Sequence, residues 1–122
     1  MPASQFDALV ESAWTRLLAE LPPELRGPAD EVVVEVCDRP TPEQARELGE
    51  DLLGLFEGLN LAEDGPEMPW RLPPVIVLFR LNLLEYCHDA TELADEIRVT
   101  LAHELGHYFG FDEDGIAELG LE

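Results

Sequence analysis

The stretch "LAHELGHYFGFDED" (residues 101–114) places two histidines four residues apart, with a glutamate beside the first. Side chains four residues apart on an α-helix project from the same face, so His103 and His107 can reach one metal ion. Glu104 lies about 60° around the helix from His107, beside the ion rather than in line with the histidines. This pattern predicts a hydrolytic zinc site, in which both histidines bind the metal and Glu104 is the general base and then the general acid. The alternative is a helix whose histidines bind nothing.

A catalytic zinc ion needs a third protein ligand and an open fourth position. Gly110 can adopt the left-handed conformation that ends a helix and turns the chain back. The residue three positions beyond it, ten after the first histidine, is Glu113, and we predict that it is the third ligand. Asp112 and Asp114 remain alternatives, because a difference of one residue in the turn would exchange them with Glu113. His88, which precedes the same helix, is a fourth candidate.

The helix that carries these histidines is predicted to run from about Ala90 to Phe109. Asp89 is the expected capping residue, and Glu92 follows it at the spacing of a capping box. Because the helix is amphipathic, its histidines occupy a face that requires a partner. One row of apolar residues at a spacing of four is expected to face the core, namely Leu93, Ile97, Leu101 and Leu105.

A second amphipathic helix is predicted near the N-terminus. Ser4 is its expected N-cap, with Asp7 three residues later, and Pro22-Pro23 is expected to stop it. The apolar positions of this helix follow helical spacing and are Phe6, Leu9, Val10, Ala13, Trp14, Leu17, Leu18 and Leu21.

A strand and a short helix are predicted next. Residues 31–37 (EVVVEVC) are rich in β-branched residues and are bounded by prolines, which indicates a strand. Thr41 is then a capping residue, followed by a proline at the first helical position and by Gln44 at the third. The helix is expected to continue to about Leu48, where Gly49 ends it.

The central part of the chain contains one strong and one ambiguous element. PVIVLFR (residues 74–80) is apolar nearly throughout, which predicts a strand that is buried on both faces. In residues 51–61 the leucines suit a helix, but Gly54 and Gly58 weaken it, so a short strand with glycine is an equal alternative. Residues 62–74 contain four prolines and a glycine and are predicted to form a loop.

The composition is that of a folded globular protein with a strong negative charge. Seven basic and 27 acidic residues give a net charge of −20 with neutral histidines. This charge repels phosphate backbones and anionic membranes, so we expect neither nucleic acid nor a membrane as a partner. It attracts metal cations and basic peptides. At 122 residues the chain has the length of one domain, and we expect a single α/β domain over residues 1–122.

Cysteine usage and targeting signals indicate the compartment. Cys37 and Cys87 allow at most one disulfide, which is not the cysteine density of a small secreted scaffold. The N-terminus lacks the basic region and apolar run of a signal peptide, and no stretch approaches the roughly 20 apolar residues of a membrane span. A cytoplasmic protein is therefore expected.

The segment "HELGHYFGFDE" (residues 103–113) is similar to the H-E-x-x-H-x-x-G-x-x-(H/D/E) signature of zincin metallopeptidases. Over most of residues 31–120 the chain resembles the minimal zincin-like proteins, a family of small bacterial metallopeptidases. This resemblance implies an α/β (α+β) fold, in which a small mixed sheet packs against the active-site helix and an N-terminal helix. It also implies zinc bound by His103, His107 and an acidic residue that matches Glu113, and a peptide or protein as the substrate.

Two other functions compete with a peptidase. A non-catalytic metal-binding or interaction module would keep the zincin helix and hydrolyse nothing. "GFDE" also resembles the end of the H-x-x-x-H-x-x-G-Y-D-H signature of bacterial rRNA-maturation metalloproteins. However, Glu113 stands where they have a third histidine, and a net charge of −20 is unfavourable for binding RNA.

The methionine turn of larger metzincins is absent, since the methionines are Met1 and Met68. If the protein is a peptidase, the substrate could add as a strand beside residues 53–57.

Overall fold

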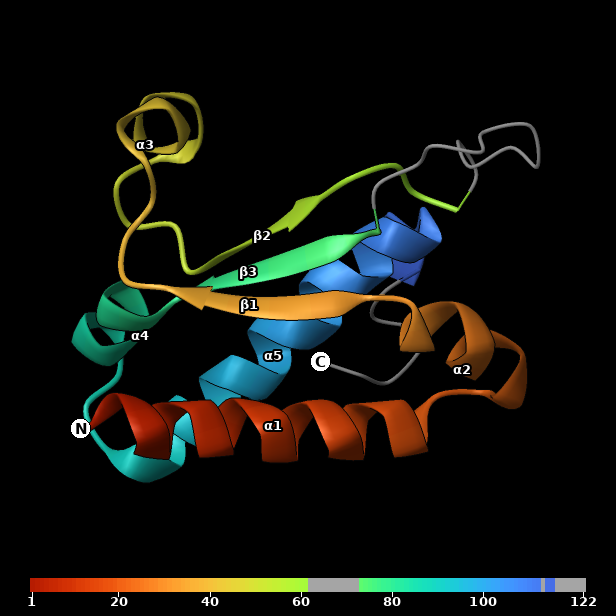
Figure 1. The fold of residues 1–122 in the computed structure, drawn as a ribbon, viewed down its shortest axis with the longest axis horizontal. Coiled ribbons are helices and arrows are strands. Elements are labelled where there is room, and N and C mark those ends of the chain that lie inside the picture. The colour runs from red at the N-terminus through yellow and green to blue at the C-terminus, as the bar shows by residue number, and fades with distance from the viewer. Residues whose placement is uncertain (62–72, 113, 116–122) are drawn as a thin grey trace.

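The computed structural model describes residues 1–61, 73–112 and 114–115, which form a mixed three-stranded sheet and several helices (Figure 1). The mixed sheet and the helices that pack on it confirm the predicted α+β fold class. Along this part of the chain the elements are α1 (Ala3–Glu20), α2 (Pro23–Asp30), β1 (Val33–Cys37), α3 (Pro42–Leu48), β2 (Gly54–Glu57), β3 (Val75–Phe79), α4 (Arg80–Tyr86) and α5 (Ala90–Phe109).

The sheet has the strand order β1-β3-β2, so β3 lies in the centre and β2 at one edge. β1 runs parallel to β3, with Val33 opposite Val75, and β2 runs antiparallel to β3, with Gly54 opposite Leu78. The ambiguous segment 51–61 therefore contains a strand. The strand forms its backbone hydrogen bonds with β3, whereas the two glycines of the segment disfavour a helix.

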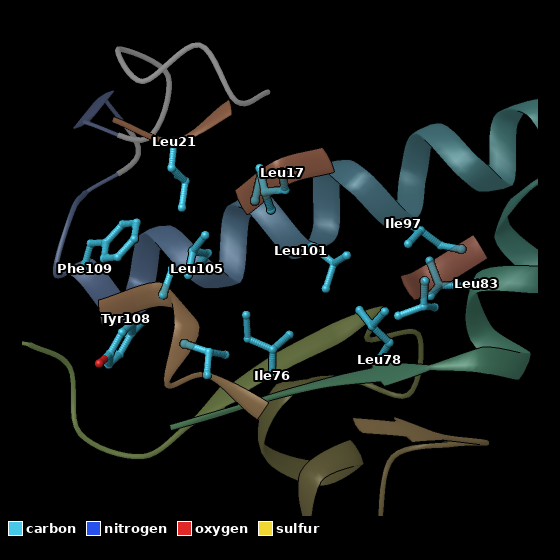
Figure 2. Close-up of a cluster of buried hydrophobic side chains, with 14 of the residues drawn as sticks. Leu17, Leu21, Ile76, Leu78, Leu83, Ile97, Leu101, Leu105, Tyr108 and Phe109 are labelled. Atoms are coloured by element: carbon cyan, nitrogen blue, oxygen red, sulfur yellow. The ribbon is translucent and has the colours of Figure 1, made fainter. Parts of the chain in front are cut away.

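The central strand β3 is buried on both faces, as the sequence predicts. Ile76, Val77, Leu78 and Phe79 have exposed fractions of at most 5%. Ile76 and Leu78 belong to the core between the sheet and α5, and Figure 2 shows them beneath Leu101 and its neighbours on that helix. Helix α5 lies against one face of the sheet, and α1 packs beside α5 (Figure 1).

Helix α5 has the predicted boundaries and the predicted core face. Its N-cap is Asp89, whose side chain accepts a hydrogen bond from the backbone N–H of Glu92 at 2.8 Å. Every residue of the predicted apolar row is at most 2% exposed, namely Leu93, Ile97, Leu101 and Leu105.

Helix α1 begins earlier than the sequence predicts. The prediction of Ser4 as N-cap is wrong: the helix starts at Ala3, and its N-cap is Pro2, without a side-chain capping bond. The extended Pro2 presents its carbonyl to the N–H groups of Gln5 and Phe6, so the serine already lies inside the helix. The predicted apolar face is confirmed, with Phe6, Val10, Leu17 and Leu21 buried and Leu9, Ala13, Trp14 and Leu18 packed partly against the core.

Helices α2 and α4 have no counterpart in the sequence-based prediction. Pro22 and Pro23 end α1 as predicted, but Pro23 also starts α2, where a missing backbone N–H costs no helical hydrogen bond. Helix α4 follows β3 without a loop, because Phe79 is both the last strand residue and the N-cap. No glycine or proline separates the apolar residues of β3 from the first residues of α4. The sequence therefore contains no turn signal at this boundary.

Helix α3 begins with the predicted capping box. The Thr41 hydroxyl accepts from the N–H of Gln44 at 3.1 Å, and the Gln44 side-chain oxygen accepts from the N–H of Thr41 at 2.9 Å. Gly49 ends the helix, as predicted, at a φ of 108°. The Gln44 amide also donates to a Glu57 carboxylate oxygen at 3.1 Å, so the first turn of α3 is tied to β2.

Asn82 on α4 joins that helix to the segment that leads into β2. This side chain is buried, and its amide donates to the carbonyls of Glu50 and Leu52, both at 2.8 Å. Its oxygen accepts from the Arg39 guanidinium at 2.8 Å. Because a buried amide without partners is costly, the two bonds to backbone carbonyls fix the path of the chain into β2.

Both cysteines are free thiols, Cys37 exposed and Cys87 half-buried. Burial, and then the negative charges of nearby carboxylates, raises the pKa of the Cys87 thiol above its ordinary value.

The loop predicted at 62–74 lies outside the described residues except for its last two. Among the helices described, none is long and apolar enough to cross a membrane.

The edge strand β2 lies very close to α5. A Cβ atom placed on Gly54 would lie 2.5 Å from the Cγ2 atom of Thr100. Beyond the strand, the N–H of Leu61 donates to the carbonyl of Tyr108 at 2.8 Å, and the rings of Phe56 and Tyr108 lie 5.6 Å apart. The strand and the residues after it are therefore fastened along the C-terminal half of α5.

The Gly54→Ala substitution is expected to lower the free energy of unfolding by about 1–3 kcal/mol, because the added methyl group overlaps Thr100. In a Thr100→Ser background the same substitution should cost less, since the clashing methyl group is gone. Gly27→Ala is the matched control, because nothing lies within 4 Å of its Cβ position, and we expect a change of no more than about 0.5 kcal/mol. Urea unfolding measures each variant, and an equal effect at both glycines would contradict the close packing.

Candidate metal centre

His103 and His107 point toward one another from successive turns of α5. Their Nε2 atoms are 3.1 Å apart, and the rings meet edge to face with centroids 4.7 Å apart. His103 is half-buried and His107 is exposed. The structure thus brings two of the residues singled out in the sequence to one point at the surface.

The separation of the two nitrogens fits a tetrahedral metal ion. Nitrogens that each bind zinc at about 2.0–2.1 Å lie about 3.3–3.4 Å apart in tetrahedral geometry, close to the 3.1 Å between these Nε2 atoms. Ligand atoms of His103, Glu104 and His107 all lie within 4.8 Å of one another. Over the described ranges, no other three side chains of metal-binding type are gathered as closely.

Glu104 is held by the edge strand β2. Its side chain is 13% exposed, and Oε1 accepts a hydrogen bond from the backbone N–H of Phe56 at 3.0 Å. Its other oxygen, Oε2, lies 4.0 Å from the Nε2 atom of His103. One oxygen is therefore fixed by the strand while the other faces the histidines. A carboxylate held in this way can exchange a proton beside a metal ion without first reorienting.

Helix α5 ends at Phe109, two residues after His107, in the turn that the sequence predicts. Gly110 adopts the left-handed conformation, with φ 80° and ψ 19°. Its N–H donates to the carbonyl of His107 and the N–H of Phe111 donates to that of Gly106, both at 3.0 Å. These two bonds form the Schellman pattern that reverses the chain at the end of a helix.

The four candidates for the third ligand have different positions. Glu113, the predicted one, lies outside the described residues. Asp112 is exposed, and its carboxylate accepts from the N–H of Gly115 at 2.8 Å, while Asp114 is also exposed. His88 lies at the opposite end of α5, exposed and 3.3 Å from a glutamate of the first helical turn. None of the three described candidates belongs to the compact cluster.

A cleft of about 340 Å³ lies beside the cluster, between α5 and the beginning of β2. Its described lining comes from two segments, Leu52, Leu53 and Gly54 on the strand side and Glu96, Val99, Thr100, His103 and Glu104 on the helix side. The cleft therefore opens directly onto the metal-binding cluster and onto the anchored carboxylate.

A larger hollow of about 540 Å³ lies beside α3 and α4. Its lining includes Arg39 and Glu85, which form an ion pair, and Asn82, whose amide is used in structural hydrogen bonds. The hydrogen bond from Arg39 lowers the pKa of the Glu85 carboxyl from its ordinary value. These groups already satisfy one another, and no histidine lies among them, so we place the functional site at the smaller cleft.

The backbone N–H of Phe56 is a part of the site that sequence reasoning missed. A main-chain donor carries no side-chain signature, and Phe56 lies 48 residues from its partner Glu104. Gly54 is the sequence feature that could have indicated this contact, because an isolated glycine in a strand often marks the close approach of another segment.

Comparison with known families gives a match over most of the chain. The sequence profile described as zincin-like metallopeptidase matches residues 29–121, a range that contains the whole sheet, α5 and the metal-binding cluster. No curated protein sequence matches the chain at a significant level. The family description implies a bound metal, typically zinc, and a peptide or protein substrate.

Metal-free protein is expected to bind one zinc ion per chain, because the two Nε2 atoms already converge at a suitable separation. The double substitution His103→Ala, His107→Ala removes both nitrogens and should weaken binding by more than about 100-fold, since the loss of a mere outer-shell partner costs about 10–100-fold. His88→Ala is the matched control and should bind like the parent. Zinc titration against a competing chelator measures all three, and equal affinity of the parent and the double variant would eliminate the site.

Proposed function

The chain belongs to the zincin-like metallopeptidase family, and on this premise we propose that it is a zinc-dependent peptidase that hydrolyses peptide bonds. The main support for this proposal is that His103, Glu104 and His107 lie close together beside the edge strand β2. This arrangement combines two metal-binding nitrogens, a positioned carboxylate and a strand edge with which an extended peptide can pair.

We assign the metal to His103, His107 and Glu113, with the fourth position open for water or substrate. The separation of the histidine nitrogens supports the first two ligands. For the third, the left-handed Gly110 reverses the chain three residues after the second histidine. The carboxylate of Asp112 accepts a hydrogen bond within the turn that follows, which favours its neighbour Glu113 as the residue directed to the ion.

Glu104 is proposed to be the general base and then the general acid. Zinc, when bound, supplies a Lewis acid that lowers the pKa of its water to about 7 and polarises the substrate carbonyl. Glu104 then takes the proton from the attacking water through Oε2 and passes it to the leaving amine. The bond from Phe56 N–H to Oε1 supports this assignment, because it leaves Oε2 facing the histidines.

The edge of β2 is proposed to bind the substrate main chain. The N–H of Phe79 donates to the carbonyl of Leu53, so Leu53 and the alternate residues after it direct their backbone groups toward β3. Gly54 accordingly directs its N–H and carbonyl to the other side of the strand, and Phe56 directs its carbonyl there, while the N–H of Phe56 on that side is bonded to Glu104. A peptide that adds there as another strand would lie beside the Glu104 carboxylate.

The Glu104→Gln variant is expected to retain zinc and to lose about 10²–10⁴-fold in hydrolysis, because it removes a base but no metal ligand. The amide oxygen can still accept the N–H of Phe56, so the local structure should remain. Cleavage of a peptide library, followed by mass spectrometry, and zinc content measure the two effects separately.

Two outcomes would overturn these assignments. If Glu104→Gln loses the metal, Glu104 is itself a ligand and the proposed base is wrong. If the zinc-loaded parent cleaves no member of the library, the function is that of a non-catalytic metal-binding module.

The Glu113→Ala variant is expected to weaken zinc binding by more than about 100-fold, because two imidazoles alone leave half of the coordination sphere without protein ligands. Asp112→Asn, which keeps an acceptor for the N–H of Gly115, should bind zinc like the parent, as should Asp114→Asn and His88→Ala. Chelator competition compares the four variants, with circular dichroism as the check on folding. Metal loss in one of the last three, with Glu113→Ala unaffected, would reassign the third ligand.

A further inference from the structure

The cleft beside the metal centre extends along α5 toward the N-terminus of that helix. Glu96, Thr100 and His103 are spaced by four and three residues, so they lie on one stripe of α5, and all three line the cleft. At about 1.5 Å per residue, the backbone of Glu96 lies roughly 10 Å along the helix axis from that of His103. A carboxylate thus sits at the far end of the cleft, beyond the reacting groups.

The walls between Glu96 and the metal centre are apolar. Val99 on α5 is 37% exposed, although it is a large hydrophobic residue, and Leu52 and Leu53 on the opposite side are half-buried. An apolar passage that ends in a carboxylate matches the side chains of lysine and arginine. These side chains bury their methylene stems against apolar surface and present a charged group at the tip.

The charge of Glu96 is not neutralised within the described part of the chain, where its side chain forms no hydrogen bond or ion pair. The nearest arginine in sequence, Arg98, forms its ion pair with Glu20 of α1, on the side of α5 that packs against that helix. No arginine or lysine lines the described cleft. The carboxylate therefore faces a passage that lacks a cation of its own.

We propose that Glu96 determines substrate specificity by binding a lysine or arginine side chain located close to the scissile bond. This inference rests on the proposed peptidase function and adds the class of substrate to it. Glu96 does not touch the reacting atoms; it selects the peptide whose cationic side chain fills the cleft while the main chain lies along β2. The net charge of −20 favours the approach of such peptides, and Glu96 places the cation.

The test uses pentapeptides that are identical except for one residue, which is lysine, arginine, norleucine or glutamate, placed in turn at each position. Binding to zinc-loaded Glu104→Gln protein is measured by fluorescence anisotropy, so that no cleavage intervenes. At one position lysine and arginine should bind about tenfold more tightly than norleucine, which is the preference expected of a partly desolvated charge pair. The same ratio should appear in kcat/KM for the parent protein.

Substituting Glu96→Gln should remove the preference for lysine over norleucine while leaving the affinity for the norleucine peptide unchanged. Glu96→Lys should turn the preference toward glutamate. Asp95→Asn is the matched control, because Asp95 is an exposed neighbour on α5 that does not line the cleft. It changes the net charge as much as Glu96→Gln does, and it should keep the preference of the parent.

The results separate this inference from the proposed function. Cleavage without a basic preference, or a preference that survives Glu96→Gln, would overturn the role of Glu96 and leave the peptidase intact. A preference in binding that depends on Glu96, without any cleavage, would support the cleft and overturn the peptidase. If no peptide binds and none is cleaved, both proposals are wrong.

Discussion

The close contact between Gly54 of β2 and Thr100 of α5 sets the position of the whole candidate site. Because glycine has no side chain, the strand approaches the helix to a distance at which a Cβ atom would overlap Thr100. At that distance the N–H of Phe56 reaches the carboxylate of Glu104, one helical turn beyond the contact. A larger residue at position 54 would move the strand outward and leave the carboxylate without its donor. Packing and chemistry therefore depend on the same point of contact.

Helix α5 combines a core face and a functional face on one rigid element. Its row of buried leucine and isoleucine side chains holds it against the sheet and α1, with each large side chain contributing about 1.5–3 kcal/mol. A mostly buried carboxylate such as Glu104 is unfavourable unless it is hydrogen-bonded, and the edge strand supplies that bond. Because both faces belong to the same helix, the hydrophobic core fixes the positions of His103 and His107 as well.

Three arginines of this acidic chain join secondary-structure elements. Arg39 and Arg80 link the end of β1 to α4, through Glu85 and Asp38 respectively, and Arg98 links α5 to α1. These cations lie outside the cleft beside the metal centre, whose described lining includes two glutamates and no arginine or lysine. The distribution of charge, rather than its sum, thus gives the cleft its local character.

The sequence by itself determined the features that depend on neighbouring residues. It located both ends of α5, the capping box of α3, the core-facing rows and the two histidines on one helical face, because each arises within one or two turns of backbone. Only the tertiary structure decided that residues 54–57 form an edge strand, that α2 and α4 are helices, and that Phe56 anchors Glu104. The anchoring bond joins residues 48 positions apart through a main-chain N–H, a donor that every residue except proline possesses. Such a contact leaves no pattern in the sequence, because which N–H is used depends on how closely two distant segments pack.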